Sequence, residues 1–218
     1  MSGSPLAPHL TRGGIVQIDP RSGAALRLIV LQYNPDTVTR TMQVKGVGES
    51  ADRSEALRLR GPAVETIKLD AELDATDQLE TPQDHVAVAK NGLGPALAAL
   101  EGMVNPTAAQ LRRLDALAGS GTLEIAPMEV PLPLFVWGAN RVVPVRVTEL
   151  SITEEAFDRR LNPIRAKVGL GLRALSVDDL GFAHRGGAIF MSALAAREAL
   201  ARQSPAGSLA QLGVDRLP

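Results

Sequence analysis

The segment "LQYNPDTVTR", Leu31–Arg40, interrupts a β-strand pattern with turn residues and then resumes it. The apolar run "LRLIV" before it predicts a strand, and the β-favouring "TVT" after it predicts another. Asn34, Pro35 and Asp36 between them are typical of a turn. Proline has no backbone N–H, so within a sheet it belongs at an edge, a bulge or a change of strand. We therefore predict that Asn34-Pro35 is a structural corner between two strands and not a ligand site.

Apolar and alternating segments on both sides of this corner predict an antiparallel sheet. The expected strands cover residues 14–19, 25–33, 37–47, 63–73, 131–138, 141–153 and 162–175. Helical spacing is expected over 82–104 and 105–119, and an Ala-rich helix over 186–203. Strands first, then helices, then strands indicate an α+β protein whose antiparallel sheet forms a β-barrel or sandwich, not a βαβ fold.

The order of these segments also predicts how the chain is organised. We expect a flexible N-terminus over 1–12, a β-barrel domain over 13–175 with a helical insert at about 82–119, and a C-terminal helical extension over 176–218. The polar segment 48–62, which contains Arg58 and Arg60, is expected to be an exposed arm that contacts a neighbouring subunit. "GLG" at 169–171, inside the last strand, indicates close approach of another backbone.

The composition narrows the classes of function. Hydrophobic residues make up 45% and charged residues 22%, as in water-soluble globular proteins, and the net charge of −1 gives no reason to expect nucleic acid as a partner. The absence of cysteine excludes disulfides, zinc–thiolate sites and a cysteine nucleophile. No apolar run reaches the roughly 20 residues that a membrane helix needs, and the N-terminus lacks a signal-peptide core. We expect a cytoplasmic protein without membrane insertion.

Residues that could carry catalytic chemistry are scattered along the chain. His9, His85 and His184 lie in different segments, and none has a metal-ligand partner at helical or hairpin spacing. Glu154 and Glu155 are adjacent in a predicted strand, so they point to opposite faces. We therefore expect no enzyme activity, no cofactor and no metal.

Three features in order resemble a known family. They are a Tyr-Asn-Pro corner after the early strand, a Pro-rich apolar strand ending in Trp-Gly, and a Phe-containing turn before a Pro-x-Arg-Ala segment. The matching residues are Tyr33, Asn34, Pro35, Pro133, Phe135, Trp137, Gly138, Phe157, Pro163, Arg165 and Ala166. Over roughly residues 26–175 the chain resembles the tube-type proteins of contractile injection systems, phage tail-like particles that drive an inner tube through a contracting sheath. It carries no LysM module after residue 175.

This resemblance implies a structural role. It implies a hexameric ring of β-barrel subunits joined by sheet pairing, at the junction between the spike hub or baseplate and the inner tube, as a tube initiator or adaptor. The implied partners are further copies of the chain, the spike hub and inner-tube proteins, within a phage tail-like particle. The main inner-tube subunit, and a small-ligand or partner-binding β-barrel module, remain alternatives. Arg165 is expected at a subunit interface, and Trp137 is expected in the core rather than at a subunit seam.

Overall fold

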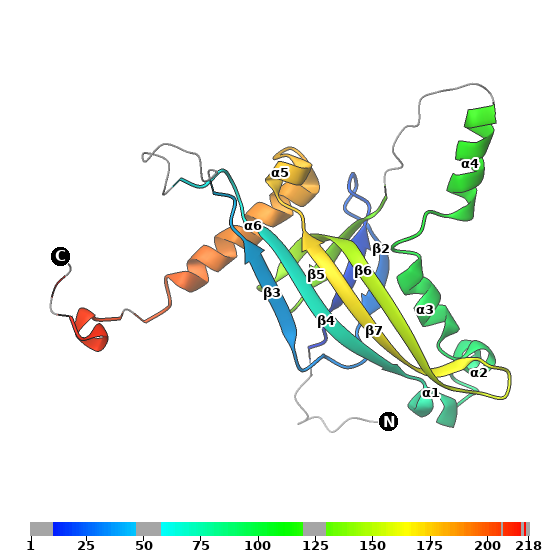
Figure 1. Ribbon diagram of the computed structural model, residues 1–218. Helices are drawn as coiled ribbons and strands as arrows, with labels where there is room; N and C mark the ends of the chain where they lie inside the picture. Colours follow the sequence, from blue (N-terminus) through cyan, green and yellow to red (C-terminus); the bar gives the residue numbers. More distant parts are fainter. Residues whose placement is uncertain (1–10, 47–57, 120–129, 206, 215, 217–218) are drawn as a thin grey trace.

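The computed structural model describes residues 11–46, 58–119, 130–205, 207–214 and 216 (Figure 1). The strands are β1 (Gly14–Ile18), β2 (Ala25–Val30), β3 (Val38–Gln43), β4 (Val64–Asp74), β5 (Leu132–Val136), β6 (Val142–Phe157) and β7 (Pro163–Ala174). The helices are α1 (Thr76–Glu80), α2 (Val86–Asn91), α3 (Gly94–Glu101), α4 (Ala108–Gly119), α5 (Val177–Leu180) and α6 (Arg185–Ala201), with a 3-10 helix, η2 (Leu209–Leu212). The structure is therefore α+β, as predicted.

The strands form one seven-stranded antiparallel sheet in the order β2-β1-β5-β6-β7-β4-β3. The long strand β6 joins its two halves, because residues 142–144 pair with β5 and residues 145–157 pair with β7. We call β2, β1 and β5 the first half, and β7, β4 and β3 the second half. A register shift between Val147 and Glu149 of β6 marks a bulge, a feature that bends a strand.

Both halves contribute to one aliphatic core on the inner face of the sheet. Ile15 and Phe135 of the first half belong to the same buried cluster as Ile67 and Leu172 of the second half, and none of the four is more than 2% exposed. A flat sheet could not bring these strands into contact, so the sheet is curled around its core. In β4, buried and exposed residues alternate as the sequence pattern predicts.

The predicted barrel is corrected to an open curled sheet. Within the described residues, β2 pairs only with β1 and β3 pairs only with β4, so the two ends of the strand order are not joined. The chain between β2 and β3 is the irregular segment 31–37 instead of a hairpin turn. Pro35 in this segment has no N–H to donate to a closing ladder. The sheet consequently keeps two unpaired edges.

The helical segment between the two groups of strands packs unevenly on this core. It begins with α1 at Thr76, and the helix expected over 82–104 is broken into α2 and α3 at Gly92, whose φ of +55° is outside the helical region. Leu97 and Leu100 of α3 are buried in the core. The predicted helix over 105–119 is confirmed as α4, but none of its residues is buried and Leu111 is 51% exposed.

Helix α6 covers part of the outer face of the first half. Ile189 of α6 packs against a second buried cluster made of Ile18, Leu132 and Leu134. His184 is the N-cap of α6, and its Nδ1 accepts a hydrogen bond from the Gly186 N–H at 3.0 Å. A Cβ on Gly187 would collide with the Gly181 carbonyl, so this position allows the helix to approach the preceding turn closely. The structure thus fixes α6 against the sheet by apolar packing and a capped start.

Candidate assembly interface

Edge strand β2 carries a row of exposed aliphatic side chains. Leu26, Leu28 and Val30 are 57%, 65% and 48% exposed. Alternation puts all three on one face of the strand. Because Leu28 pairs with Val16 of β1, this is the same outer face that α6 covers further along the sheet. We call these three residues the β2 strip.

An exposed apolar strand at an open edge is unusual in a monomer. Its unpaired N–H and C=O groups form a template for another strand, and natural proteins commonly protect such edges with charges, prolines or a covering element. The β2 strip leaves the edge aliphatic. The opposite edge, β3, is also open and ends near Met42 and Val44, which are 50% and 66% exposed. The molecule therefore presents two pairing edges at opposite ends of its strand order.

The Asn34 corner connects these two edge strands, as predicted. Asn34 Oδ1 accepts a hydrogen bond from the Gly13 N–H at 2.9 Å, and Asn34 Nδ2 donates to the Thr11 carbonyl at 2.9 Å. Gln32 was not singled out from the sequence, yet its side chain exchanges two hydrogen bonds with the Asp74 backbone, at 2.7 and 2.9 Å. Pro35 is half-buried and the Tyr33 side chain is exposed. The corner is thus held to the start of β1 and the end of β4.

Other residues of the family pattern lie in the core. Trp137 is partly buried, packs against the main core and stacks on Phe135, with ring centroids 5.7 Å apart and planes 16° apart. Trp137 therefore contacts the core, and the choice between a core position and a subunit seam stays a prediction. Gly138 follows with a φ of +75°, which opens the turn between β5 and β6. Ala166 of β7 is fully buried.

Pro133 lies in β5, opposite Gln17 of β1, and three further residues of the family pattern lie at the β6–β7 hairpin. Phe157 pairs with Pro163 at the end of the ladder, and its side chain is 49% exposed. The Pro163 carbonyl accepts a hydrogen bond from the Leu93 N–H at 2.8 Å, so the hairpin is tied to the helical segment. Arg165 Nε donates to Asp74 Oδ2 at 3.0 Å, while its side chain stays 54% exposed. The interface role of Arg165 stays a prediction.

The predicted arm falls mostly on residues 47–57, which lie outside the described residues. Its far end is described, and Arg58 and Arg60 are both exposed there. Leu59 forms an isolated bridge with Gly46, and the Arg60 N–H donates to the Lys45 carbonyl at 2.9 Å. The two ends of the arm are therefore held together beside the end of β3. Contact with a neighbouring subunit stays a prediction.

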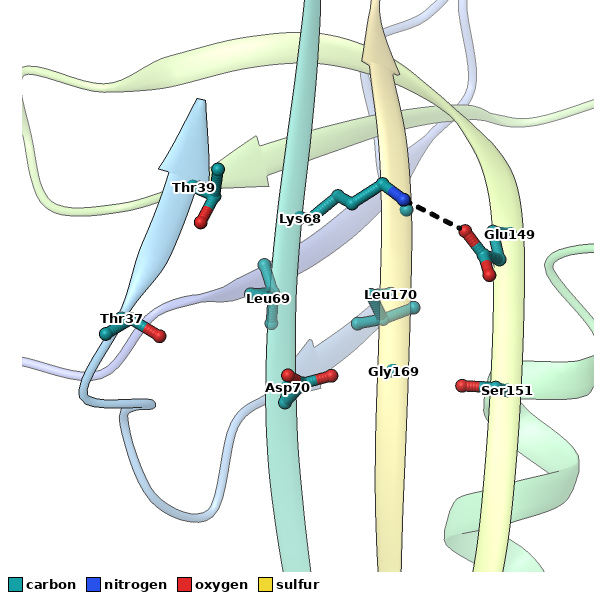
Figure 2. A pocket seen from close by; sticks show the side chains of 10 residues that line it. Thr37, Thr39, Lys68, Leu69, Asp70, Glu149, Ser151, Gly169 and Leu170 are labelled. Atoms are coloured by element: carbon teal, nitrogen blue, oxygen red, sulfur yellow. Dashed lines mark ion pairs between the residues drawn. The ribbon is translucent and has the colours of Figure 1, made fainter. Parts of the chain in front are cut away.

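A shallow polar groove of about 340 Å³ lies on the outer face of the second half and β6 (Figure 2). Its floor contains Gly169 and Gly171 of β7, where a Cβ would collide with Ser151 or Glu149 of β6. The "GLG" segment is thus closely packed, but against side chains of the neighbouring strands and not against another backbone as predicted. Lys68 Nζ and Glu149 Oε2 form an exposed ion pair across the groove at 3.5 Å. The polar side chains of the groove are scattered over an open surface. We therefore interpret the groove as a hydrated surface and not as a ligand site.

Glu65 of β4 is a buried carboxylate at the centre of a charge cluster with three partly exposed arginines. Glu65 is 4% exposed; its Oε1 lies 2.6 Å from Arg40 Nε, and its Oε2 lies 2.9 Å from Arg197 Nη1 of α6. Burial alone would raise the pKa of Glu65, but the hydrogen bond from Arg40 and the charges of Arg197 and Arg40 outweigh it and lower the pKa. Arg141 interacts electrostatically with the same three side chains. Burial and the charges of Arg40 and Arg197 lower its pKa.

The part of the chain that the structure describes contains neither a metal-binding cluster nor a membrane-spanning helix. No group of three or more His, Cys, Asp or Glu side chains there is placed to hold a metal ion. Among the same residues, no helix has both the length and the hydropathy to cross a bilayer.

Comparison with known proteins gives little further information. No known family matches the sequence, and no curated protein matches it. Among solved structures, this protein is similar to a chain in the tail of an empty GTA particle with C6 symmetry. The two are 10% identical with a TM-score of 0.29, and the match covers 74% of this chain and 90% of that chain. A chain in the virion of a native gene transfer agent particle gives 10% identity and a TM-score of 0.27 with the same coverage. TM-scores this low do not establish a common fold.

Proposed function

We propose that this protein is a structural subunit of a phage tail-like particle and assembles with copies of itself through its two open sheet edges. The observation that carries the proposal is the exposed β2 strip on one unpaired edge, with a second unpaired edge, β3, at the other end of the sheet. The order of the family-pattern residues in the sequence supports the same role.

A contact between β2 of one copy and β3 of the next is heterologous. Such contacts form a closed ring when the rotation between copies closes, and a filament when it does not. Strand pairing would satisfy the backbone groups of both edges, as in β-strand addition. It would also bring a neighbour's side chains next to the β2 strip. The resemblance implies six copies in the ring.

Within the particle, we propose a junction ring between the spike hub or baseplate and the inner tube, as tube initiator or adaptor. The segment after β7 supports this role, because it continues beyond α6 and away from the sheet (Figure 1). Leu209, Leu212 and Val214 in this tail are 36%, 76% and 40% exposed. A projecting apolar tail suits contact with the spike hub or with inner-tube proteins. The proposed setting is the cytoplasm, without nucleic acid or membrane insertion.

The mass of the purified protein by light scattering, followed by negative-stain imaging, tests self-assembly. Leu28→Lys places a charge in the β2 strip and is expected to abolish rings with the circular dichroism spectrum unchanged, because Leu28 is 65% exposed. Leu111→Lys is the matched control, since it makes the same change at a 51% exposed leucine of α4.

The outcomes separate the alternatives. Single rings lost only in Leu28→Lys support the proposal, while long tubes from the purified protein favour the main inner-tube subunit. Rings that persist in Leu28→Lys exclude the β2 edge as the interface. A monomer at all concentrations that also fails to join rings when mixed with the spike hub would contradict the proposal and favour a binding module.

A further inference from the structure

The charge cluster around Glu65 contains more positive than negative charge. Two guanidinium groups, those of Arg40 and Arg197, contact the Glu65 carboxylate, and that of Arg141 interacts electrostatically with all three side chains without an ion pair to Glu65. Glu65 accepts from Arg40 and Arg197, and Arg141 forms no ion pair within the described residues. Three positive charges against one negative charge leave a formal excess of two. The Arg40 and Arg197 side chains are only 26% and 31% exposed, so water shields this excess incompletely and it favours binding of an anion.

A single atom points to the same conclusion. Arg40 Nη2 is buried and has no hydrogen-bond partner. Among the described residues, no other buried side-chain nitrogen or oxygen lacks a partner. The Nε atom of the same guanidinium group already donates a hydrogen bond to Glu65 Oε1. A buried donor without an acceptor is costly, and an unsatisfied group in a folded protein commonly marks a ligand or water that completes it.

We propose that this cluster binds one further oxyanion, a carboxylate or a phosphate, between Arg40 and Arg141. Planar guanidinium groups bind such oxygens through paired hydrogen bonds. One bound oxyanion would accept from Arg40 Nη2 and would offset the charge of Arg141. The site would not compete with Glu65, whose two oxygens are held by Arg40 Nε and Arg197.

A groove is lined by chain neighbours of two arginines of the cluster, although the charged residues of the cluster do not line it themselves. It has a volume of about 410 Å³ and lies between the β5–β6 turn and α6. Asn140 and Val142, which flank Arg141 in the chain, line it, and so does Ala196, which precedes Arg197. Arg40 itself lies on the open edge strand β3. The oxyanion can therefore be a free anion or an acidic side chain of the copy that pairs with this edge; only the second source rests on the proposed assembly.

Thermal unfolding of dilute protein, in phosphate and in chloride at equal ionic strength, tests the free-anion source. At about ten times its dissociation constant, phosphate should lower the unfolding equilibrium constant roughly tenfold and raise Tm by about 3–6 °C. Arg141→Gln should abolish this rise. In chloride it should be no less stable than the unaltered protein, because it removes an uncompensated charge while Glu65 keeps both partners.

Two further variants make the test specific. Arg112→Gln on α4 makes the same change at an exposed arginine and should keep the full phosphate effect. Arg40→Lys can still pair with Glu65 but lacks a second nitrogen, so it should fold and lose most of the phosphate effect. Arg40→Lys also keeps the test decisive if Arg141→Gln does not fold.

The results distinguish the two sources of the oxyanion. A Tm rise in phosphate at low protein concentration, lost in Arg141→Gln, supports a free anion. If phosphate has no effect, and Tm in chloride rises with protein concentration in the unaltered chain but not in Arg141→Gln, the oxyanion is a carboxylate of a second copy. If neither change occurs, or if Arg141→Gln is clearly less stable in chloride, the proposal is overturned. The phosphate result does not depend on ring formation.

Discussion

The two halves of the sheet differ on their outer faces although their inner faces share one aliphatic core. The outer face of the first half is aliphatic and includes Ile18, Leu132 and Leu134, with the β2 strip beside them. The outer face of the second half and β6 is polar and includes Lys68 and Glu149. Polar side chains can remain in water, whereas an aliphatic face must be covered.

This difference explains where α6 lies and what it leaves exposed. The helix packs on the aliphatic cluster of the first half through Ile189, and Arg197 ties its later part to Glu65 of the second half. The β2 strip continues the aliphatic face and remains exposed. The β2 strip, at the edge of the aliphatic face, is therefore available for contact with another molecule. The following changes test this contrast, from the largest expected effect to the smallest.

Removing α6 should have the largest effect. A chain ending at Gly181 would expose the cluster of Ile18, Leu132 and Leu134 and would leave Glu65 without Arg197. We expect it to aggregate or to unfold without a cooperative transition, measured by light scattering and thermal denaturation. A chain ending at Gln203 keeps α6 and loses only the tail, so its Tm should change little. Equal stability of the two truncated chains would show that α6 is not the cover of this face.

Glu65→Gln should destabilise the protein by about 3–5 kcal/mol, because it removes the buried carboxylate that Arg40 and Arg197 share. Urea denaturation at neutral pH measures the loss. The folded-state pKa of Glu65 lies below its unfolded value, so its contribution is complete above the unfolded pKa and is lost as pH falls through the folded pKa. The difference between the two proteins should therefore shrink in acid. Glu149→Gln on the exposed face is the control and should cost under about 0.5 kcal/mol.

Leu132→Ala should cost about 3 kcal/mol, near the middle of the usual range for buried leucines. Leu132 is 5% exposed beneath α6, so truncation leaves a cavity between the helix and the sheet. Urea denaturation is again the measurement, and Leu26→Ala in the β2 strip is the matched control. Leu26 is 57% exposed, so its truncation should change stability by under about 0.5 kcal/mol. A similar cost at both sites would mean that the strip is covered in solution.

The sequence allowed prediction of most elements because their patterns are local. The alternation in β4 depends only on the conformation of that strand, and the turn residues Asn34-Pro35 depend only on that of the corner. The predicted half-buried strand and the predicted corner are both confirmed. The open sheet could not be read from the sequence, because pairing between β2 and β3 depends on the path of segment 31–37. The break of the first long helix at Gly92 depends on its contact with the β6–β7 hairpin, where the Pro163 carbonyl approaches.

The candidate surfaces were harder to predict for a related reason. Leu26, Leu28 and Val30 form an apolar strand in the sequence, and nothing local distinguishes an exposed edge strand from a buried one. Glu65 alternates with Ile67 and Leu69, so the sequence puts it on the mostly apolar face of its strand, which is a signal for a buried charge. Its partners Arg40 and Arg197 lie 25 residues before and 132 residues after it, so only the fold brings them together.

Lys68→Ala on the polar half should have the smallest effect. Its ion pair with Glu149 spans 3.5 Å, and both side chains are more than 60% exposed, so water screens the attraction and the pair adds little. We expect a change in unfolding free energy under about 0.5 kcal/mol, with no added dependence on salt beyond that of the unaltered protein. A loss above about 1 kcal/mol in urea denaturation would mean that this face is shielded from water. The polar half would then have to be covered too, as the aliphatic half is by α6.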